Sequence, residues 1–76
     1  MAIDYTTLLT TEQKRNILQQ RIGQFAAEAY QHSLNKATCE TLGDTDGVEN
    51  ADKALGILDA AINTHSAELA ALGDAE

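Results

Sequence analysis

The stretch Glu40–Asn50, with the sequence ETLGDTDGVEN, lies between two long segments that contain no proline. Its four carboxylates and two glycines are compatible with a cation-binding loop or with a turn between two helices. An EF-hand loop needs oxygen ligands at its first, third and fifth positions, glycine at the sixth and glutamate at the twelfth. Gly47 directly follows Asp46, so this spacing does not fit. We therefore predict a helix–helix turn over residues 43–47.

Each residue of the turn has a role in such a join. Gly43 can adopt the left-handed conformation that ends a helix. Asp46 is expected to cap the following helix, and Glu49, three residues later, to complete a capping box. Both carboxylates are favoured at the positive end of a helix dipole. The turn is thus expected to fix the register of a helical hairpin.

Before the turn, apolar residues recur at steps of three and four, which predicts a helix over residues 11–42. Thr10 is expected to cap it, with Gln13 completing a capping box. The apolar stripe, which we expect to form the hairpin and oligomer interface, contains Leu18, Ile22, Phe25, Ala26, Ala29, Tyr30 and Leu34.

After the turn, a similar pattern predicts a second helix over residues 48–72, with Gly73 opening a polar tail, 73–76. Residues 1–10 form an N-terminal segment in which Asp4 is expected to cap a single helical turn. Nothing in the chain alternates as a strand does, so the fold class is all-α, in one domain. The second half of the expected interface contains Leu55, Leu58, Ile62, His65, Leu69 and Leu72.

A short turn makes the two helices antiparallel neighbours. Centred near residue 45, it brings Arg21 near Glu68, and Arg15 near Asp74 or Glu76. The pairs expected across the hairpin are Leu42–Val48, Leu34–Leu55, Tyr30–Leu58, Ala26–Ile62, Ile22–Leu69 and Leu18–Leu72, with Phe25 opposite His65.

A lone hairpin covers one side of each stripe, and a chain of 76 residues buries a small core. Ile17 and Ile57 lie off the main stripes, where they would contact a second partner. We expect a homo-oligomer, most simply two hairpins in a four-helix bundle, or docking on another protein.

Composition excludes several classes of partner. Twelve acidic residues against five basic ones give a net charge of −7, which disfavours binding to nucleic acid or to an anionic membrane. No apolar run approaches the roughly 20 residues that span a bilayer, and the N-terminus does not resemble a secretory signal. The chain is expected to be soluble.

Neither a catalytic residue, a metal site nor a cofactor is predicted. Glu28, His32, Asn35 and Cys39 share one polar flank, but a di-iron bundle needs Glu-x-x-His, and here the spacing is four. His65 is expected to pack at the helix interface. We therefore predict a protein that is not an enzyme.

One basic cluster leaves an alternative open. Lys14, Arg15 and Arg21 lie toward one end of the hairpin, and in an oligomer such ends can converge into a pocket for an anionic small molecule. The other interpretation is that these side chains pair with acidic residues of the same hairpin.

Residues 11–36, TEQKRNILQQRIGQFAAEAYQHSLNK, and the alanine-rich 51–72 resemble small uncharacterised helical proteins of tailed phages of actinobacteria. The resemblance implies a structural, virion-associated or accessory phage protein, in the particle or in the cytoplasm of the infected host. Phages also encode small helical oligomers that sequester cyclic nucleotide signals of host defence. This chain is similar to those in size and hairpin character, which gives the alternative function: an anti-defence protein.

Overall fold

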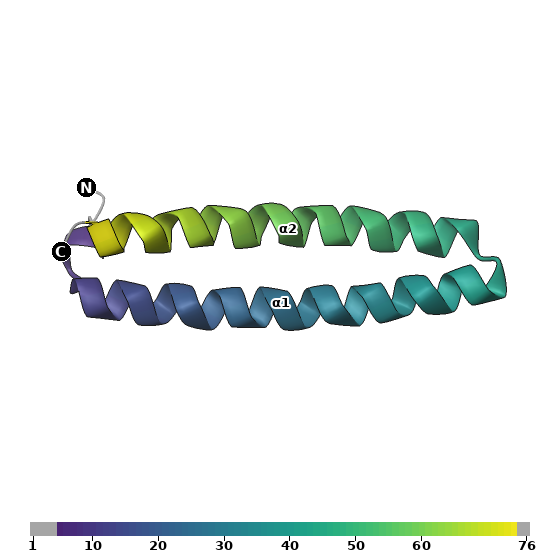
Figure 1. Cartoon of the computed structure of the whole chain (residues 1–76), viewed down its shortest axis with the longest axis horizontal. Helices are drawn as coiled ribbons and strands as arrows, with labels where there is room; N and C mark the ends of the chain where they lie inside the picture. Colours follow the sequence, from purple (N-terminus) through teal and green to yellow (C-terminus); the bar gives the residue numbers. More distant parts are fainter. Residues whose placement is uncertain (1–4, 75–76) are drawn as a thin grey trace.

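The computed structural model of the chain describes residues 5–74. They form a short 3₁₀-helix, η1 (Tyr5–Thr7), and two long helices, α1 (Thr11–Leu42) and α2 (Thr45–Asp74). The long helices run antiparallel, side by side, with one tight turn between them (Figure 1). The predicted all-α helical hairpin is therefore confirmed, and α1 begins and ends where the sequence predicted.

Thr10 caps the start of α1. Its Oγ1 accepts a hydrogen bond from the backbone N–H of Gln13 at 3.0 Å, and its own N–H donates to Gln13 Oε1 at 2.8 Å. This reciprocal pair satisfies two of the amide groups that a helix start leaves unpaired. The predicted capping box is confirmed.

Gly43 ends α1 in the left-handed conformation, with φ 71°. Its N–H donates to the carbonyl of Glu40 at 3.2 Å, and the N–H of Asp44 donates to that of Cys39 at 2.8 Å. These two bonds form a Schellman motif, which a residue with a Cβ would strain because φ is positive. The predicted role of Gly43 is confirmed.

The start of α2 corrects the prediction for the turn. Asp44, and not Asp46, is the N-cap: its Oδ1 accepts the N–H of Gly47 at 3.0 Å, and its carbonyl accepts the N–H of Val48 at 3.1 Å. Because the cap follows Gly43 directly, α2 begins three residues earlier than predicted, at Thr45. Asp46 lies in the first turn, where its charge still faces the positive helix end.

The end of α2 also differs from the prediction. α2 continues through Gly73 to Asp74, so the predicted helix end at residue 72 is wrong, and Gly73 does not terminate the helix. η1 supplies the single turn expected near the N-terminus. Asp4, its expected cap, lies outside the described residues, as do positions 75 and 76 of the polar tail.

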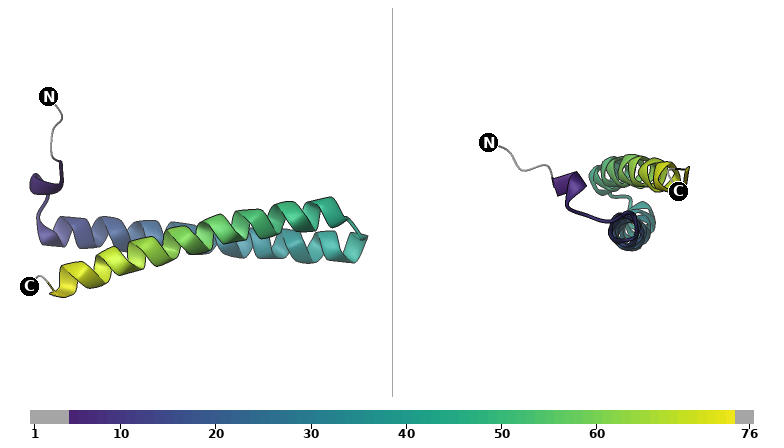
Figure 2. Two further views of the ribbon diagram at one scale, coloured as in Figure 1. Left: turned by 90° about the horizontal axis from the view of Figure 1, so that it is seen from above. Right: turned by 90° about the vertical axis from the view of Figure 1, so that its left-hand side faces the viewer.

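The two helices pack along a seam of the coiled-coil type, crossing at a shallow angle (Figure 2). On each helix, a series of half-buried or buried residues recurs at alternating steps of four and three, which is the heptad pattern. The seam consists of Thr11, Arg15, Leu18, Ile22, Phe25, Ala29, His32, Lys36 and Cys39 on α1, and of Val48, Ala51, Leu55, Leu58, Ile62, His65, Leu69 and Leu72 on α2.

In the second half of α1, the face that packs against α2 differs from the predicted one. Tyr30 and Leu34 are 65% and 50% exposed, and Ala26 is exposed as well. The seam continues instead through His32 and Lys36. The predicted pairs Tyr30–Leu58 and Leu34–Leu55 are therefore wrong, although both α2 residues lie in the seam as expected.

The core of this hairpin is thin. Among the residues whose side chains the structure describes, 5–73, only Ala51 and Leu58 are buried, with 6% and 8% of their surface exposed. Every other seam side chain keeps contact with water. Apart from η1 at one end, no further element within residues 5–74 covers the remaining sides of the two helices.

Candidate functional site

Large apolar side chains of the hairpin reach solvent at several places. In the described part of the chain these are Tyr5, Leu8, Ile17, Tyr30, Leu34, Leu42 and Ile57. Single exposed apolar residues are common on protein surfaces, whereas contiguous sets are typical of interaction sites. An interaction site is therefore expected where several of these seven side chains lie together.

Tyr30 and Leu34 belong to a continuous set on α1. Together with four small residues they recur at alternating steps of four and three, and all six are exposed. At 100° per residue this set lies on the side of α1 that faces away from α2. We call it the outer stripe: Gly23, Ala27, Tyr30, Leu34, Ala37 and Thr41.

Ile17 and Ile57, expected to share a second face, are exposed but do not adjoin. Ile17 lines a hollow together with Leu72. Ile57 precedes Leu72 by 15 residues on α2, which is about 22 Å along the helix axis at 1.5 Å per residue. These two side chains therefore do not form one patch.

His65 lies opposite Phe25, as predicted. The two rings meet edge to face, with their centroids 5.0 Å apart and their planes at 75°. The Arg21 guanidinium lies 5.2 Å from the centroid of the Phe25 ring, and its Nε–H donates to His65 Nε2 at 3.0 Å. The three side chains form one cluster across the seam.

The hydrogen bonds of this cluster select one tautomer of the His65 imidazole. Nδ1 lies 2.7 Å from the carbonyl oxygen of Ala61, which can only accept, so Nδ1 carries a proton. Nε2 accepts from Arg21, which can only donate, so Nε2 carries none. The partners fit the Nδ1–H tautomer, and both ring nitrogens bind groups of the hairpin itself.

The predicted basic end is only partly assembled. Arg21 binds His65 in place of the expected Glu68. Lys14 and Glu68 line a hollow of about 330 Å³ between η1 and the hairpin, together with Tyr5, Thr6, Leu9, Ile17, Leu18 and Leu72. The expected partners of Arg15 are the side chain of Asp74 and Glu76, which lie outside the described residues.

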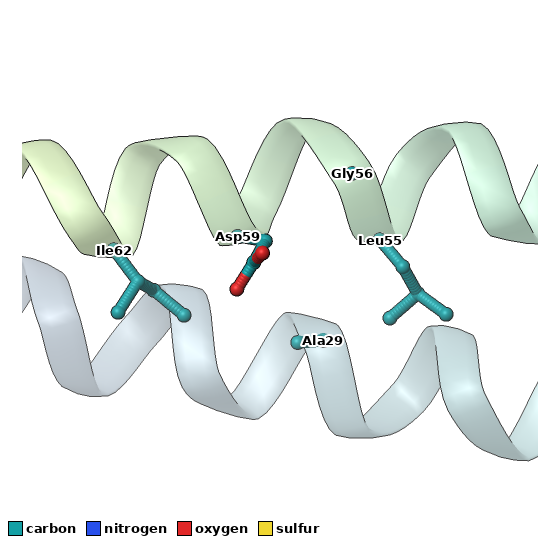
Figure 3. Close-up of a pocket in the computed structure, with 5 residues that line it drawn as sticks. All are labelled: Ala29, Leu55, Gly56, Asp59 and Ile62. Carbon is teal, nitrogen blue, oxygen red and sulfur yellow. The ribbon is translucent and has the colours of Figure 1, made fainter.

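A second hollow, of about 320 Å³, opens on the side of the hairpin near its middle (Figure 3). Leu55 and Ile62 point toward α1 on either side of Asp59, across from Ala29. Asp59 is the only ionisable group in its lining, which Gly56 completes. One carboxylate among apolar atoms offers no second group for acid–base chemistry or for ligating a metal.

Ion pairs stabilise the turn-proximal half of the hairpin. Lys36 Nζ lies 2.7 Å from Asp52 Oδ1, joining α1 to α2, and Lys53 lies 3.5 Å from Glu49 within α2. The hydrogen bond to Asp52, followed by the charge of that carboxylate, raises the pKa of Lys36 above its ordinary value. Lys36, a polar residue of the seam, is thereby held in its charged form.

Residues 5–74 contain neither a metal-binding cluster nor a membrane-spanning helix. No three histidine, cysteine, aspartate or glutamate side chains there come close enough to hold a metal ion. Within the same residues, neither helix has a stretch long and apolar enough to cross a lipid bilayer.

Comparison with known proteins adds no relative. No family model matches the chain, and neither a curated protein sequence nor a solved structure matches it.

Proposed function

We propose that this chain is a non-enzymatic helical-hairpin protein with a structural or assembly role, which acts by associating with further helices. The first partner is a second copy of the chain. The observation that carries the proposal is the thin core: Ala51 and Leu58 alone are buried among residues 5–73, while Tyr30 and Leu34 are at least half exposed.

Burial of apolar surface is the main favourable term in folding, and small domains are marginal without some supplement. This chain has a single cysteine and therefore no internal disulfide. Association with further helices adds the apolar burial that the seam lacks, because it removes the outer apolar side chains from water. Full burial of each large side chain contributes about 1.5–3 kcal/mol.

The proposal extends to the biological setting. Residues 11–36 and 51–72 resemble small helical proteins of actinobacterial tailed phages, and that resemblance supports a role in the phage particle or in the cytoplasm of the infected host. The position of the gene tests it: a place beside capsid and tail genes fits an assembly role, whereas a place among accessory genes points to a different task.

Sedimentation equilibrium of the purified chain, from about 5 to 500 μM, tests self-association directly. We expect a mass above that of the 8.1 kDa monomer, and a thermal midpoint that rises with concentration because the folded state is linked to assembly. A folded monomer over the whole range would contradict the proposal.

Calorimetry with cyclic di- and trinucleotides tests the alternative ligand-binding role. The net charge of −7 disfavours an anionic ligand, and the Nε–H of Arg21 is already donated to His65. We expect no heat of binding from any of these compounds.

A further inference from the structure

The outer stripe of α1 is symmetric about its own middle. From Gly23 to Thr41 its residues run small, small, large, large, small, small. Positions equally far from the centre match in size: Gly23 with Thr41, Ala27 with Ala37, and Tyr30 with Leu34. A surface with this property is complementary to a second copy of itself turned end for end, which is the requirement for a two-fold, isologous contact.

The heptad spacing fits the same geometry. Coiled-coil packing inserts each side chain of one helix into a hole formed by four side chains of its neighbour. When two outer stripes run antiparallel with their centres aligned, Tyr30 of one copy packs beside Leu34 of the second, and the reverse pair forms as well. The small residues on both sides let the two backbones approach closely along about 27 Å, the length of 18 residues in a helix.

The distribution of charge selects α1 over α2 as the contact helix. α1 has four basic and three acidic residues, whereas α2 has one basic and six acidic ones. Two α2 helices would repel each other, while two α1 helices would not. The residues bordering the outer stripe are uncharged apart from Glu40: they are Gln24, Gln31 and Thr38 on one side, and Ala26, Ser33 and Glu40 on the other.

We propose that two copies of this chain associate through their outer stripes, with their α1 helices antiparallel about a two-fold axis near residue 32. This rests on the self-association proposed above and identifies the face that mediates it. Asn16 and Gln20 continue the heptad spacing toward the N-terminus but are polar. The contact therefore ends near Gly23, and the end of the hairpin that holds η1 stays outside it.

Charge substitutions test the face. The double variant Tyr30→Glu/Leu34→Glu alters two exposed positions, so the hairpin keeps its helical circular dichroism, while dimerisation weakens at least about tenfold. Ile57→Glu is the matched control, because Ile57 is 71% exposed on α2, and it leaves the dimerisation constant unchanged. Sedimentation equilibrium of the wild type and both variants measures these constants.

The outcomes separate the two proposals. A wild-type chain that stays monomeric contradicts self-association itself. A wild-type oligomer that the double variant leaves intact, whether or not Ile57→Glu disrupts it, contradicts the outer stripe alone and leaves the proposed function standing.

Disulfide trapping tests the antiparallel register. In a Cys39→Ser background, the pair Gly23→Cys/Thr41→Cys places each new thiol opposite its counterpart in the second copy, and a Cβ at Gly23 meets nothing within 4 Å. Oxidised glutathione is expected to join position 23 of one copy to position 41 of the other, giving a covalent dimer. The control Gly23→Cys/Ala37→Cys is displaced by four residues, or about 6 Å, and crosslinks poorly. Equal crosslinking of both variants would overturn the register.

Discussion

Arg21 donates a hydrogen bond from Nε to Nε2 of His65, 3.0 Å away, across the seam between α1 and α2. The other ring nitrogen of His65 donates to the carbonyl of Ala61. We predict that the imidazole of His65 is the Nδ1–H tautomer in the folded chain at pH 8. Two-dimensional ¹H–¹⁵N spectra that correlate the ring nitrogens with the carbon-bound ring protons distinguish the two tautomers, and a proton found on Nε2 would contradict the geometry.

Arg21→Met provides the control for this assignment. Methionine keeps an apolar chain against Phe25 but removes the donor to Nε2, so the Nε2–H tautomer of His65 should gain population. His32, the second histidine of the chain, reports on the solvent conditions, because its ring has no bond to Arg21 and its spectrum should not change between the wild type and the variant.

The second prediction concerns the cap of α2. Asp44→Ala removes the acceptor of the Gly47 N–H and should lower the free energy of unfolding by about 1 kcal/mol. Asp44→Asn, whose side chain can still accept this bond, should retain most of the stability. Asp46→Ala loses only a charge near the helix dipole, at about 0.3–1 kcal/mol, and urea denaturation ranks the three variants. Equal losses for Asp44→Ala and Asp46→Ala would argue against Asp44 as the cap.

The third prediction separates two glycines of α2. Replacing a glycine by alanine inside an exposed helix normally stabilises it by about 0.5–1 kcal/mol, and Gly56, with nothing within 4 Å of an added Cβ, should behave this way. At Gly47, an added Cβ would lie 2.5 Å from Cys39 Sγ and 2.7 Å from Asp44 Oδ2. Gly47→Ala should therefore lower the thermal midpoint while Gly56→Ala raises it.

If Gly47→Ala proves as stabilising as Gly56→Ala, the close approach of Cys39 to the first turn of α2 is not a feature of the folded chain in solution. Adding Cys39→Ala to Gly47→Ala refines the measurement, because it removes the nearer of the two contacts. We expect this second change to restore part of the lost stability.

The features that could be predicted from sequence are those that local chemistry determines. Thr10 and Gln13 specify a capping box within four residues, and Gly43 specifies the left-handed end of α1. The antiparallel pairing about a turn centred near residue 45 predicts Phe25 opposite His65, and the two rings do meet. None of these required knowledge of the distant half of the chain.

The face that α1 turns toward α2 could not be predicted in the same way. Apolar residues of α1 belong to two heptad sets, the seam and the outer stripe, and both sets are present from Gly23 onward. Treating them as one set predicted a single broad stripe. The structure separates them, because a straight seam must continue along one set, even through His32 and Lys36. Tyr30 and Leu34 therefore lie outside the seam. A prediction that maximises apolar contact within one hairpin cannot anticipate this.

Asp44 was missed as the cap of α2 because the sequence offers two aspartates, and the capping-box spacing favours Asp46 with Glu49. The signal that distinguishes them is the Schellman motif. It directs the N–H of Asp44 back to Cys39 and leaves Asp44 with its side chain at the start of the next helix.

The fourth prediction uses the ion pair between Lys36 and Asp52. Asp52 raises the pKa of Lys36 above its ordinary value in the folded chain, mainly through their hydrogen bond. The folded state therefore holds this proton more tightly than the unfolded state, so the stabilisation is fully present below the ordinary lysine pKa and is lost as pH rises through the folded value.

Asp52→Asn should lower the urea midpoint at pH 8. The difference in urea midpoint between this variant and the wild type should shrink above pH ~11. Asp59→Asn, one heptad further along α2, is the control whose difference from the wild type should not change over this range. A difference for Asp52→Asn that stays constant to pH ~12 would show that its effect does not depend on the charge of a lysine.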